Sequence, residues 1–368
     1  MPAIAFNDLR AGDDRAAIDH AVRRVIDRGW FVLGPEVEAF EHEFASSAGA
    51  ATSVGVGTGT DAIALALRAL GIGPGDEVIT SPLSAAYTAL AIMMAGARPV
   101  FADLDERRLT LSPDAVAAAV SPRTAAIVPV HLYGQAADMA AIEAIASRHN
   151  LALIEDCAQA HLATSDGRPV GTIGVAGAFS FYPTKNLGAL GDGGAVVTND
   201  GRLGDRIKRL RNGGQSARCR HDEFGVNSRL DEIQAAVLRE RLGFLPAWTG
   251  QRRALARAYR VELTGAALIV PPELDRGHVY HLFPIRSSAR DELQRHLAGH
   301  GVETLVHYPT PIPRQAALAT AEPVHCPVAD RVCAELISLP LYPSLPAEAV
   351  RRVCAAVRAF HPERATRA

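Results

Sequence analysis

The sequence has no excess of charge that would suggest a polyanionic partner. Its 38 Lys and Arg residues are balanced by 40 Asp and Glu residues, which leaves a formal net charge of −2. Proteins that bind nucleic acid or an anionic membrane surface usually carry a basic patch or stripe. We therefore expect neither nucleic acid nor a membrane among the partners of this chain.

Paired cysteines and long apolar runs are also missing. The five cysteines form no CxxC pair and no metal-ligand spacing, and an odd number in a chain of 368 residues is typical of reduced thiols. No apolar run approaches the length of a membrane-spanning helix. The first residues show no basic region followed by an apolar one. These features predict a soluble, cytoplasmic protein with no metal site.

Short apolar runs that alternate with Ala-rich helical stretches dominate the first half of the chain. Runs that are apolar on both faces and joined by helices indicate a mostly parallel sheet covered on both sides, and thus an α/β fold. In such sheets ligands bind beyond the carboxyl ends of the strands. The candidate strands are Glu77–Thr80, Pro99–Ala102, Ala125–Val130, Leu151–Ile154, Ala176–Phe181 and Ala195–Thr198, and the main helical stretches are Ala62–Leu70, Ala85–Ala95 and Met139–His149.

A long amphipathic helix is predicted after Ser228, because apolar residues then recur at helical spacing. Ser228 and Asp231 are spaced like a capping pair at its start. Pro246 is expected to interrupt this helix, and a second helix should follow through Arg252–Leu263. We place the domain boundary here: residues 1–246 form a large domain with an N-terminal helix, and residues 247–368 form a smaller α+β domain.

One lysine, Lys185, stands between an apolar run and a glycine-rich turn. It lies within SFYPTKNLGALGDGG at residues 180–194, and an upstream strand-like run delivers Glu155 and Asp156 at its carboxyl end. A lysine in such a turn can hold pyridoxal phosphate (PLP) as a Schiff base, while an aspartate pairs with the pyridine nitrogen. Glu155 should point the other way at a strand end. Taken alone, a lysine is commonly a surface charge and an aspartate a helix cap.

A glycine-rich segment, GTGTDA at residues 57–62, precedes another helical run. The free N–H groups and partial positive charge of a helix start bind phosphate, and glycines let the backbone approach it. Read in isolation, the segment is also an ordinary glycine-rich turn.

Four motifs follow one another in a fixed order: DCAQAH at 156–161, SFYPTK at 180–185, GALGDGGAV at 188–196 and NSRLDEIQ at 227–234. Together they closely resemble the nucleotide-sugar aminotransferases of the DegT/DnrJ/StrS group. The resemblance runs from Trp30 to Pro343. It implies a PLP-dependent transferase of fold type I, with a large domain built on a mostly parallel sheet and flanking helices, a smaller C-terminal α+β domain, and pyridoxamine phosphate formed during turnover.

The resemblance also implies roles for individual residues. Lys185 and Asp156 would be catalytic, with Lys185 as both the Schiff-base residue and the proton-transferring base. The cofactor contacts would come from Gly59, Thr60, Asp61, Asp156, Gln159, Ser180, Lys185 and Asn227. Asp61 should offer its backbone N–H, because a carboxylate facing phosphate would be repelled.

Asn227, by the same resemblance, reaches the cofactor phosphate of the neighbouring subunit, which implies a homodimer with shared active sites. The alternative is that Asn227 caps the following helix, and both roles are compatible. His161 is either a ligand-facing group or a structural histidine. Candidate residues for the substrate are His131, Tyr133, Arg229 and Tyr308, of which Arg229 would pair with a carboxylate or a diphosphate.

The chain departs from the family pattern at three positions. Ala85 stands where relatives often stack an aromatic residue on the pyridine ring, so that either Tyr87 compensates or the ring packs on apolar atoms. Pro313 replaces a frequent histidine, and Val226 replaces a tyrosine. These departures concern the substrate site more than the cofactor chemistry.

The segment KNLGALGDGG at residues 185–194 resembles family members that act at the third carbon of the sugar. The implied reaction moves an amino group from L-glutamate to a nucleotide-linked keto-sugar, first of all a dTDP-3-keto-6-deoxyhexose. A UDP-linked 3-keto sugar is the alternative substrate, and a PLP-dependent sugar dehydratase or lyase is the alternative reaction. Relatives that dehydrate sugars carry histidine in place of lysine, whereas this chain has Lys185.

Overall fold

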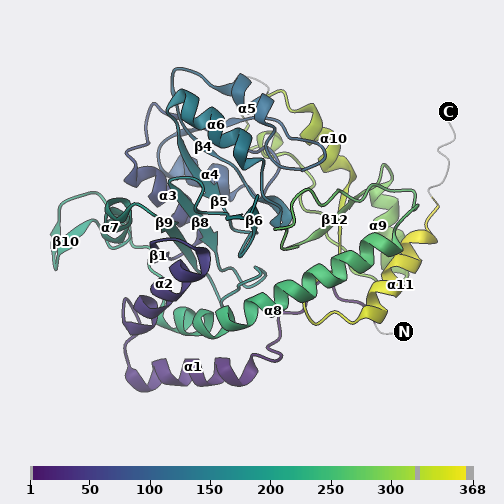
Figure 1. Ribbon diagram of the computed structural model, residues 1–368, viewed down its shortest axis with the longest axis horizontal. Helices are drawn as coiled ribbons and strands as arrows, with labels where there is room; N and C mark the ends of the chain where they lie inside the picture. Colours follow the sequence, from purple (N-terminus) through teal and green to yellow (C-terminus); the bar gives the residue numbers. More distant parts are fainter. Residues whose placement is uncertain (1–2, 320–323, 362–368) are drawn as a thin grey trace.

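The computed structural model describes residues 3–319 and 324–361. Its centre is a sheet of seven strands in the order β1-β9-β8-β5-β4-β2-β3 (Figure 1). The strands are β1 (Thr52–Val56), β2 (Glu77–Thr80), β3 (Arg98–Phe101), β4 (Thr124–Val128), β5 (Ala152–Asp156), β8 (Ala176–Ser180) and β9 (Gly194–Thr198). Strands β8, β5, β4, β2 and β3 pair in parallel, and β9 runs antiparallel to both neighbours. The mostly parallel sheet is confirmed, although β1 was not predicted.

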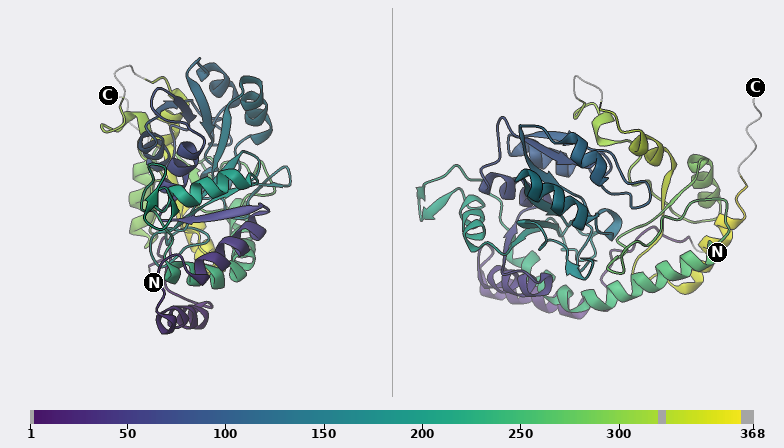
Figure 2. Two further views of the ribbon diagram at one scale, coloured as in Figure 1. Left: turned by 90° about the vertical axis from the view of Figure 1, so that its left-hand side faces the viewer. Right: turned by 45° about the horizontal axis from the view of Figure 1, so that its top comes forward.

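Helices cover both faces of this sheet, as the two views in Figure 2 show. The helices of the large part are α1 (Arg15–Arg28), α2 (Pro35–Ala48), α3 (Gly59–Ala69), α4 (Tyr87–Met94), α5 (Pro113–Ala119), α6 (Met139–His149), α7 (Gly201–Leu210) and α8 (Glu232–Glu262). One face packs on α3, α4 and α7, and the other on α2, α5, α6 and the first half of α8. Because both faces are buried, the strands carry apolar residues on both sides.

A second hydrophobic core lies in the C-terminal part of the chain. It is formed by α9 (Arg290–Gly299), α11 (Ala347–Arg358), the second half of α8 and the antiparallel pair of β12 (Phe283–Arg286) with β13 (Leu336–Leu339). Ile4 joins this core and pairs with Val302, so the N-terminal segment starts here before it reaches α1. The helix α10 (Pro327–Glu335) packs toward the sheet instead.

The expected break at Pro246 is wrong. Helix α8 runs for 31 residues through Pro246, and Figure 1 shows it as one long helix that spans both parts of the molecule. A proline inside a helix removes one hydrogen bond, but burial at both ends stabilises α8. Leu245 packs in the core beside α2, whereas Ala256 packs in the C-terminal core. The predicted domain boundary at residue 246 therefore falls within a helix, and the division into two domains stays a prediction.

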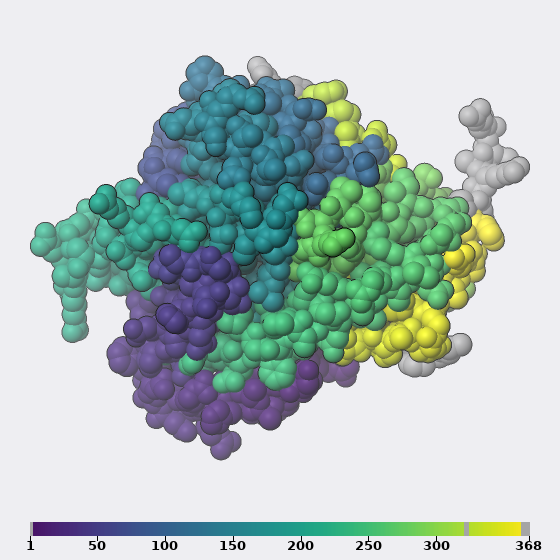
Figure 3. Space-filling model, viewed as in Figure 1, coloured from purple at the N-terminus to yellow at the C-terminus, as the bar shows by residue number. Residues whose placement is uncertain are grey.

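Several short elements complete the fold. They are the pair of β6 (Thr164–Ser165) with β7 (Arg168–Pro169), the pair of β10 (Gln215–Ala217) with β11 (Arg220–His221), and the 3-10 turns η1 (Leu132–Gly134) and η2 (Ile312–Arg314). The β10–β11 hairpin projects from the body, as the teal extension in Figure 3 shows. Among the described residues, no helix has the length and apolar character needed to cross a membrane.

Candidate active site

Lys185 lies in the tight turn that follows β8. Its N–H donates to the Tyr182 carbonyl at 2.8 Å, and the Ala189 N–H returns to the Phe181 carbonyl at 2.7 Å. Gly188 makes this turn possible, because a Cβ there would lie 2.5 Å from the Pro183 carbonyl oxygen. The glycine that follows Lys185 is thus required by the close approach of two backbone segments.

Lys185 lines a cleft of about 430 Å³. The N-terminal segment around Asn7–Arg10 and the middle of α8 line the same cleft. Burial lowers the pKa of Lys185 to about 8, although the nearby Asp156 carboxylate acts in the opposite direction. Among the described residues the Lys185 amine has no hydrogen-bond partner, so it is available as a nucleophile and a base.

Asp156 ends β5 and is held by two donors. Thr88 Oγ1, from α4, donates to Asp156 Oδ2 at 2.6 Å, and the Ala158 N–H donates to Oδ1 at 3.0 Å. Both side chains are buried. Sequence reasoning did not single out Thr88, although a lone hydroxyl in the apolar helical run after Ala85 was a usable signal.

Gln159 connects two of the residues expected at the substrate site. Its Oε1 accepts the Tyr133 N–H at 2.7 Å, and its Nε2 donates to the Tyr308 hydroxyl at 3.1 Å. Tyr133 in turn donates from its hydroxyl to the His307 carbonyl. Burial raises the pKa of Tyr308 to about 12, so its phenol stays protonated at neutral pH. The structure thus brings Gln159, Tyr133 and Tyr308 together.

The start of α3 has backbone N–H groups of the kind that bind an anion. Thr58 caps the helix, and its Oγ1 accepts the Asp61 N–H at 3.0 Å. The N–H groups of Gly59 and Thr60 in the first turn have no acceptor among the described residues. Gly59 lies directly against Ser180, since a Cβ at Gly59 would be 2.7 Å from the Ser180 Cβ. Gly59, Thr60 and Ser180 therefore converge at one spot.

Asp61 takes a different part from the one expected. Its N–H is already bound to Thr58, and its Oδ2 accepts a hydrogen bond from Ser228 Oγ at 2.8 Å. The Ser228 hydroxyl also accepts the Gly57 N–H at 2.9 Å, so Ser228 does not cap α8, whose N-cap is Asp231. Asp61 thus links the start of α3 to the segment before α8, and its backbone N–H is not free to bind a phosphate.

These residues fit PLP. The amine of Lys185, the carboxylate of Asp156 and the free N–H groups at the start of α3 are the three groups that an aldehyde, a pyridinium nitrogen and a phosphate require. They are carried by the ends of adjacent elements: β5, the turn after β8, and the helix that packs on both strands. Only glycine allows this close approach of the α3 start to Ser180, because a Cβ at residue 59 would lie 2.7 Å from the Ser180 Cβ.

Asn227 and Arg229 lie away from the cleft around Lys185. Asn227 is exposed and forms an isolated bridge with Asn212, and Arg229 Nη1 donates to Asn212 Oδ1 at 3.0 Å. The exposure of Asn227 leaves its side chain free to reach another chain. Neither residue lines the cavity that Lys185 lines, and the same holds for Gly59, Thr60, Asp156, Gln159 and Ser180.

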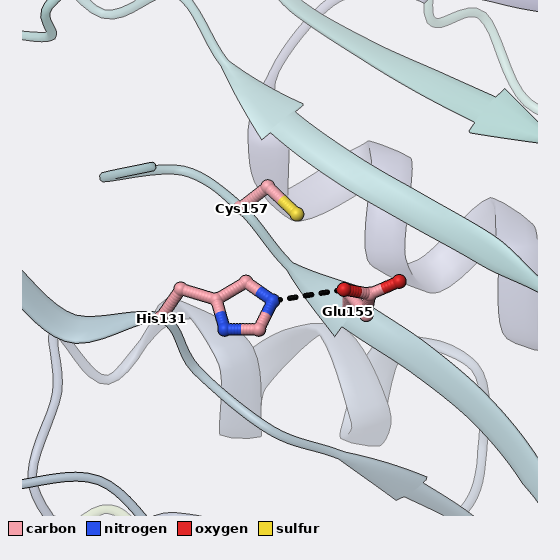
Figure 4. Close-up of side chains that lie close together, drawn as sticks. All are labelled: His131, Glu155 and Cys157. Atoms are coloured by element: carbon pink, nitrogen blue, oxygen red, sulfur yellow. Dashed lines mark hydrogen bonds and ion pairs between the residues drawn. The ribbon is translucent and has the colours of Figure 1, made fainter. Parts of the chain in front are cut away.

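His131 belongs to a buried network rather than to an open site (Figure 4). Its Nε2 lies 3.0 Å from Glu155 Oε2, and its Nδ1 accepts the Ala137 N–H at 3.1 Å. Glu155 also accepts the N–H groups of Gly171, Ile173 and Gly174, each at 2.8 Å. Because its ring nitrogens are both occupied and the side chain is fully buried, His131 does not face a substrate in this arrangement.

The same network accounts for a cluster of metal-type ligands. His131, Glu155 and Cys157 bring their ligand atoms within 4.8 Å of one another. The carboxylate, however, already has four hydrogen-bond donors, and burial raises the pKa of the Cys157 thiol well above its usual value. The cluster connects β5 to the loop at residues 171–174 through hydrogen bonds and so stabilises the fold.

Two alternatives that the sequence left open concern His161 and the segment around Ala85. His161 is buried against the rings of Phe179 and Phe181, and burial lowers its pKa to about 3. Neither ring nitrogen has a hydrogen-bond partner in good geometry among the described residues, so both roles stay compatible with the structure. Tyr87 is 64% exposed at the start of α4. The buried Tyr308 interacts with the backbone of Ala85, the residue at the position of the missing aromatic side chain.

A family model described as the DegT/DnrJ/EryC1/StrS aminotransferase family matches residues 13–358. The chain belongs to this family. Its members are PLP-dependent enzymes, in agreement with the arrangement of Lys185, Asp156 and the α3 turn. The expected fold type and cofactor are thereby confirmed.

Similar proteins cover almost the whole chain. The erythromycin biosynthesis sensory transduction protein EryC1 of Saccharopolyspora erythraea is 49% identical over 362 residues, which are 97% of this chain and 99% of the relative. The dTDP-3-amino-3,4,6-trideoxy-alpha-D-glucose transaminase of Streptomyces venezuelae is 46% identical over 97% of this chain and 96% of its own. The crystal structure of S. venezuelae DesV with a ketimine intermediate matches with a TM-score of 0.94 at 46% identity, and covers 97% of this chain and 98% of that chain.

Proposed function

We propose that this protein is a nucleotide-sugar aminotransferase that moves an amino group from L-glutamate to the 3-keto group of a nucleotide-linked sugar, first of all a dTDP-3-keto-6-deoxyhexose. The observation that carries the proposal is the pairing of a reactive Lys185 with an Asp156 that is fixed at the end of β5. The family assignment and the transaminase from S. venezuelae, which is named for a 3-amino sugar, support the position of amination.

The residues divide the work as follows. PLP, when bound, supplies the aldehyde and an electron-accepting ring. Asp156 would face the ring nitrogen, and Thr88 and the Ala158 N–H keep its carboxylate in place. The N–H groups of Gly59 and Thr60, with Ser180, would hold the phosphate. Lys185, with its pKa lowered to about 8, would take the proton from the substrate Cα.

We further propose a cytoplasmic homodimer with shared active sites. Asn227 is exposed next to the start of α8, and the apolar segment Trp30–Val32 is also exposed there. The two regions touch, because Val32 pairs with Asp231 and the Glu232 N–H donates to the Phe31 carbonyl at 3.1 Å. An apolar surface beside an exposed polar residue is what a second copy of this chain would cover.

The test is a pair of half-reactions followed by absorbance. Purified protein with PLP is mixed with L-glutamate alone, and conversion of the cofactor to its pyridoxamine form with release of 2-oxoglutarate is expected. The aminated protein is then offered dTDP-linked 3-keto and 4-keto 6-deoxyhexoses and the UDP-linked 3-keto sugar. Amination of the 4-keto sugar alone would overturn the 3-keto assignment, and product formation without 2-oxoglutarate would favour a lyase or dehydratase.

A further inference from the structure

The cleft beside Lys185 contains a second buried cation that none of the roles above uses. Arg252, from the second half of α8, is 6% exposed and lines the same cavity as Lys185. Its Nη1 donates to three backbone carbonyls, those of Leu341 at 2.9 Å, His281 at 3.3 Å and Tyr280 at 3.4 Å. A single guanidinium nitrogen, Nη1, thus donates all three of these hydrogen bonds.

No carboxylate among the described residues pairs with Arg252. Other arginines of the cleft are neutralised: Arg241 pairs with Asp14 at 2.8 Å, and Arg10 pairs with Asp8 at 2.7 Å. For Arg252, burial lowers the pKa to about 10 with no opposing negative charge. A buried charge without a partner is costly, and such charges are usually paired or reserved for a ligand.

The geometry of the guanidinium indicates which ligand fits. Because Nη1 takes the three carbonyls, the edge formed by Nε and Nη2 has no acceptor among the described residues. This edge presents two parallel N–H groups, which match the two oxygens of one carboxylate. The cavity that Arg252 and Lys185 both line has a volume of about 430 Å³, which is space enough for an amino acid.

We propose that Arg252 binds a carboxylate of the amino donor and so holds the donor's amine toward Lys185. The assignment rests on the aminotransferase function proposed above and names the residue that selects an acidic donor. It replaces Arg229 in that role, because Arg229 is bound to Asn212 and lies outside the cavity. The diphosphate of a sugar nucleotide also offers paired anionic oxygens to a guanidinium. The experiment therefore distinguishes a carboxylate from a diphosphate as the ligand of Arg252.

The experiment measures binding by calorimetry on the PLP-loaded protein with two probes that do not react. Glutarate carries the carboxylates of the donor without its amine, and dTDP carries the diphosphate. Arg252→Met removes the guanidinium, and Arg253→Met is the matched control, since Arg253 donates to the His278 carbonyl at 2.9 Å and does not line the cavity. Loss of the bidentate contact should weaken glutarate binding by about tenfold to one-hundredfold.

A second variant tests the site with Arg252 intact. It is needed because Arg252→Met also removes three hydrogen bonds to backbone carbonyls and could disturb the fold. Gln251→Glu leaves Arg252 in place and brings a negative charge to the same cavity wall, where Gln251 is exposed. It should weaken glutarate binding several-fold at low salt, with less effect at high salt. Thermal unfolding checks that each variant is folded.

The outcomes are distinct. Weaker glutarate binding in Arg252→Met and Gln251→Glu, with unchanged dTDP binding and an unaffected Arg253→Met control, supports the proposal. Unchanged glutarate binding, or a loss of dTDP binding in its place, overturns it. If the wild-type protein converts its cofactor with L-glutamate while the Arg252 variants bind glutarate normally, only the carboxylate site fails. If the wild-type protein neither reacts with L-glutamate nor binds glutarate, the proposed donor fails with it.

Discussion

Thr88 donates a hydrogen bond to Asp156 across 2.6 Å, from the first turn of α4 to the end of β5. Both residues are buried, and the sheet places β5 next to β8, the strand that precedes the Lys185 turn. A hydroxyl that donates to a carboxylate stabilises its ionised form and fixes its direction. Thr88 is therefore a positioning residue for the carboxylate that we propose to face the cofactor nitrogen.

Replacing Thr88 by valine tests this relationship with little change in shape. A hydrogen bond to a charged group contributes about 1.5–3 kcal/mol, so Thr88→Val should lower kcat by about tenfold or more. The absorption of the bound cofactor against pH should also shift, because Asp156 would hold the ring proton less firmly. Thr88→Ser keeps the hydroxyl and serves as the control. Normal turnover and an unchanged spectrum in Thr88→Val would reject the role.

The depressed pKa of Lys185 predicts the pH dependence of cofactor capture. Only the neutral amine attacks an aldehyde, and the pKa of Lys185 is lowered from 10.5 to about 8. The rate at which the cofactor-free protein binds PLP covalently should therefore rise with pH to a midpoint near 8, and not near 10.5. The measurement follows the cofactor band after mixing at each pH.

The small number of lysines makes the covalent band easy to assign to one residue. The chain has only two lysines, Lys185 and the exposed Lys208 of α7. Lys208→Arg should leave the profile unchanged, whereas Lys185→Ala should remain folded and lose both the covalent band and turnover. A band that survives in Lys185→Ala and disappears in Lys208→Arg would contradict the assignment.

Much of the fold followed from local patterns in the sequence, because strands buried on both faces leave apolar runs and the helices between them are rich in alanine. The proposed cofactor residues came from the resemblance of ordered motifs to a known family, and their roles stay predictions. The continuous path of α8 was not predicted, because local rules treat Pro246 as a helix breaker. In the structure, packing in two cores outweighs the hydrogen bond that Pro246 cannot form. Arg252 and Thr88 were missed for a related reason: their partners lie far along the chain, and only tertiary structure shows what each side chain faces.

Glu155 should matter for stability rather than for substrate. Its carboxylate accepts hydrogen bonds from His131 and from the N–H groups of Gly171, Ile173 and Gly174. In Glu155→Gln an amide NH₂ must face at least one of these donors. A buried donor that loses its acceptor costs about 1–3 kcal/mol, so the free energy of unfolding should fall by at least that amount in denaturant titration. Glu143→Gln, at a surface pair with Arg168, should change little.

A shared active site can be tested by mixing two inactive proteins. Lys185→Ala lacks the catalytic amine, and Asn227→Ala lacks the phosphate contact that we assign to the neighbouring subunit. In a mixed dimer, one site combines the intact Lys185 of one chain with the intact Asn227 of the other. Statistical exchange would give mixed dimers in about half of the population, each with one good site of two, so about a quarter of the wild-type activity should return. If Asn227 serves its own chain, no mixture regains activity, because every chain then lacks one of the two groups.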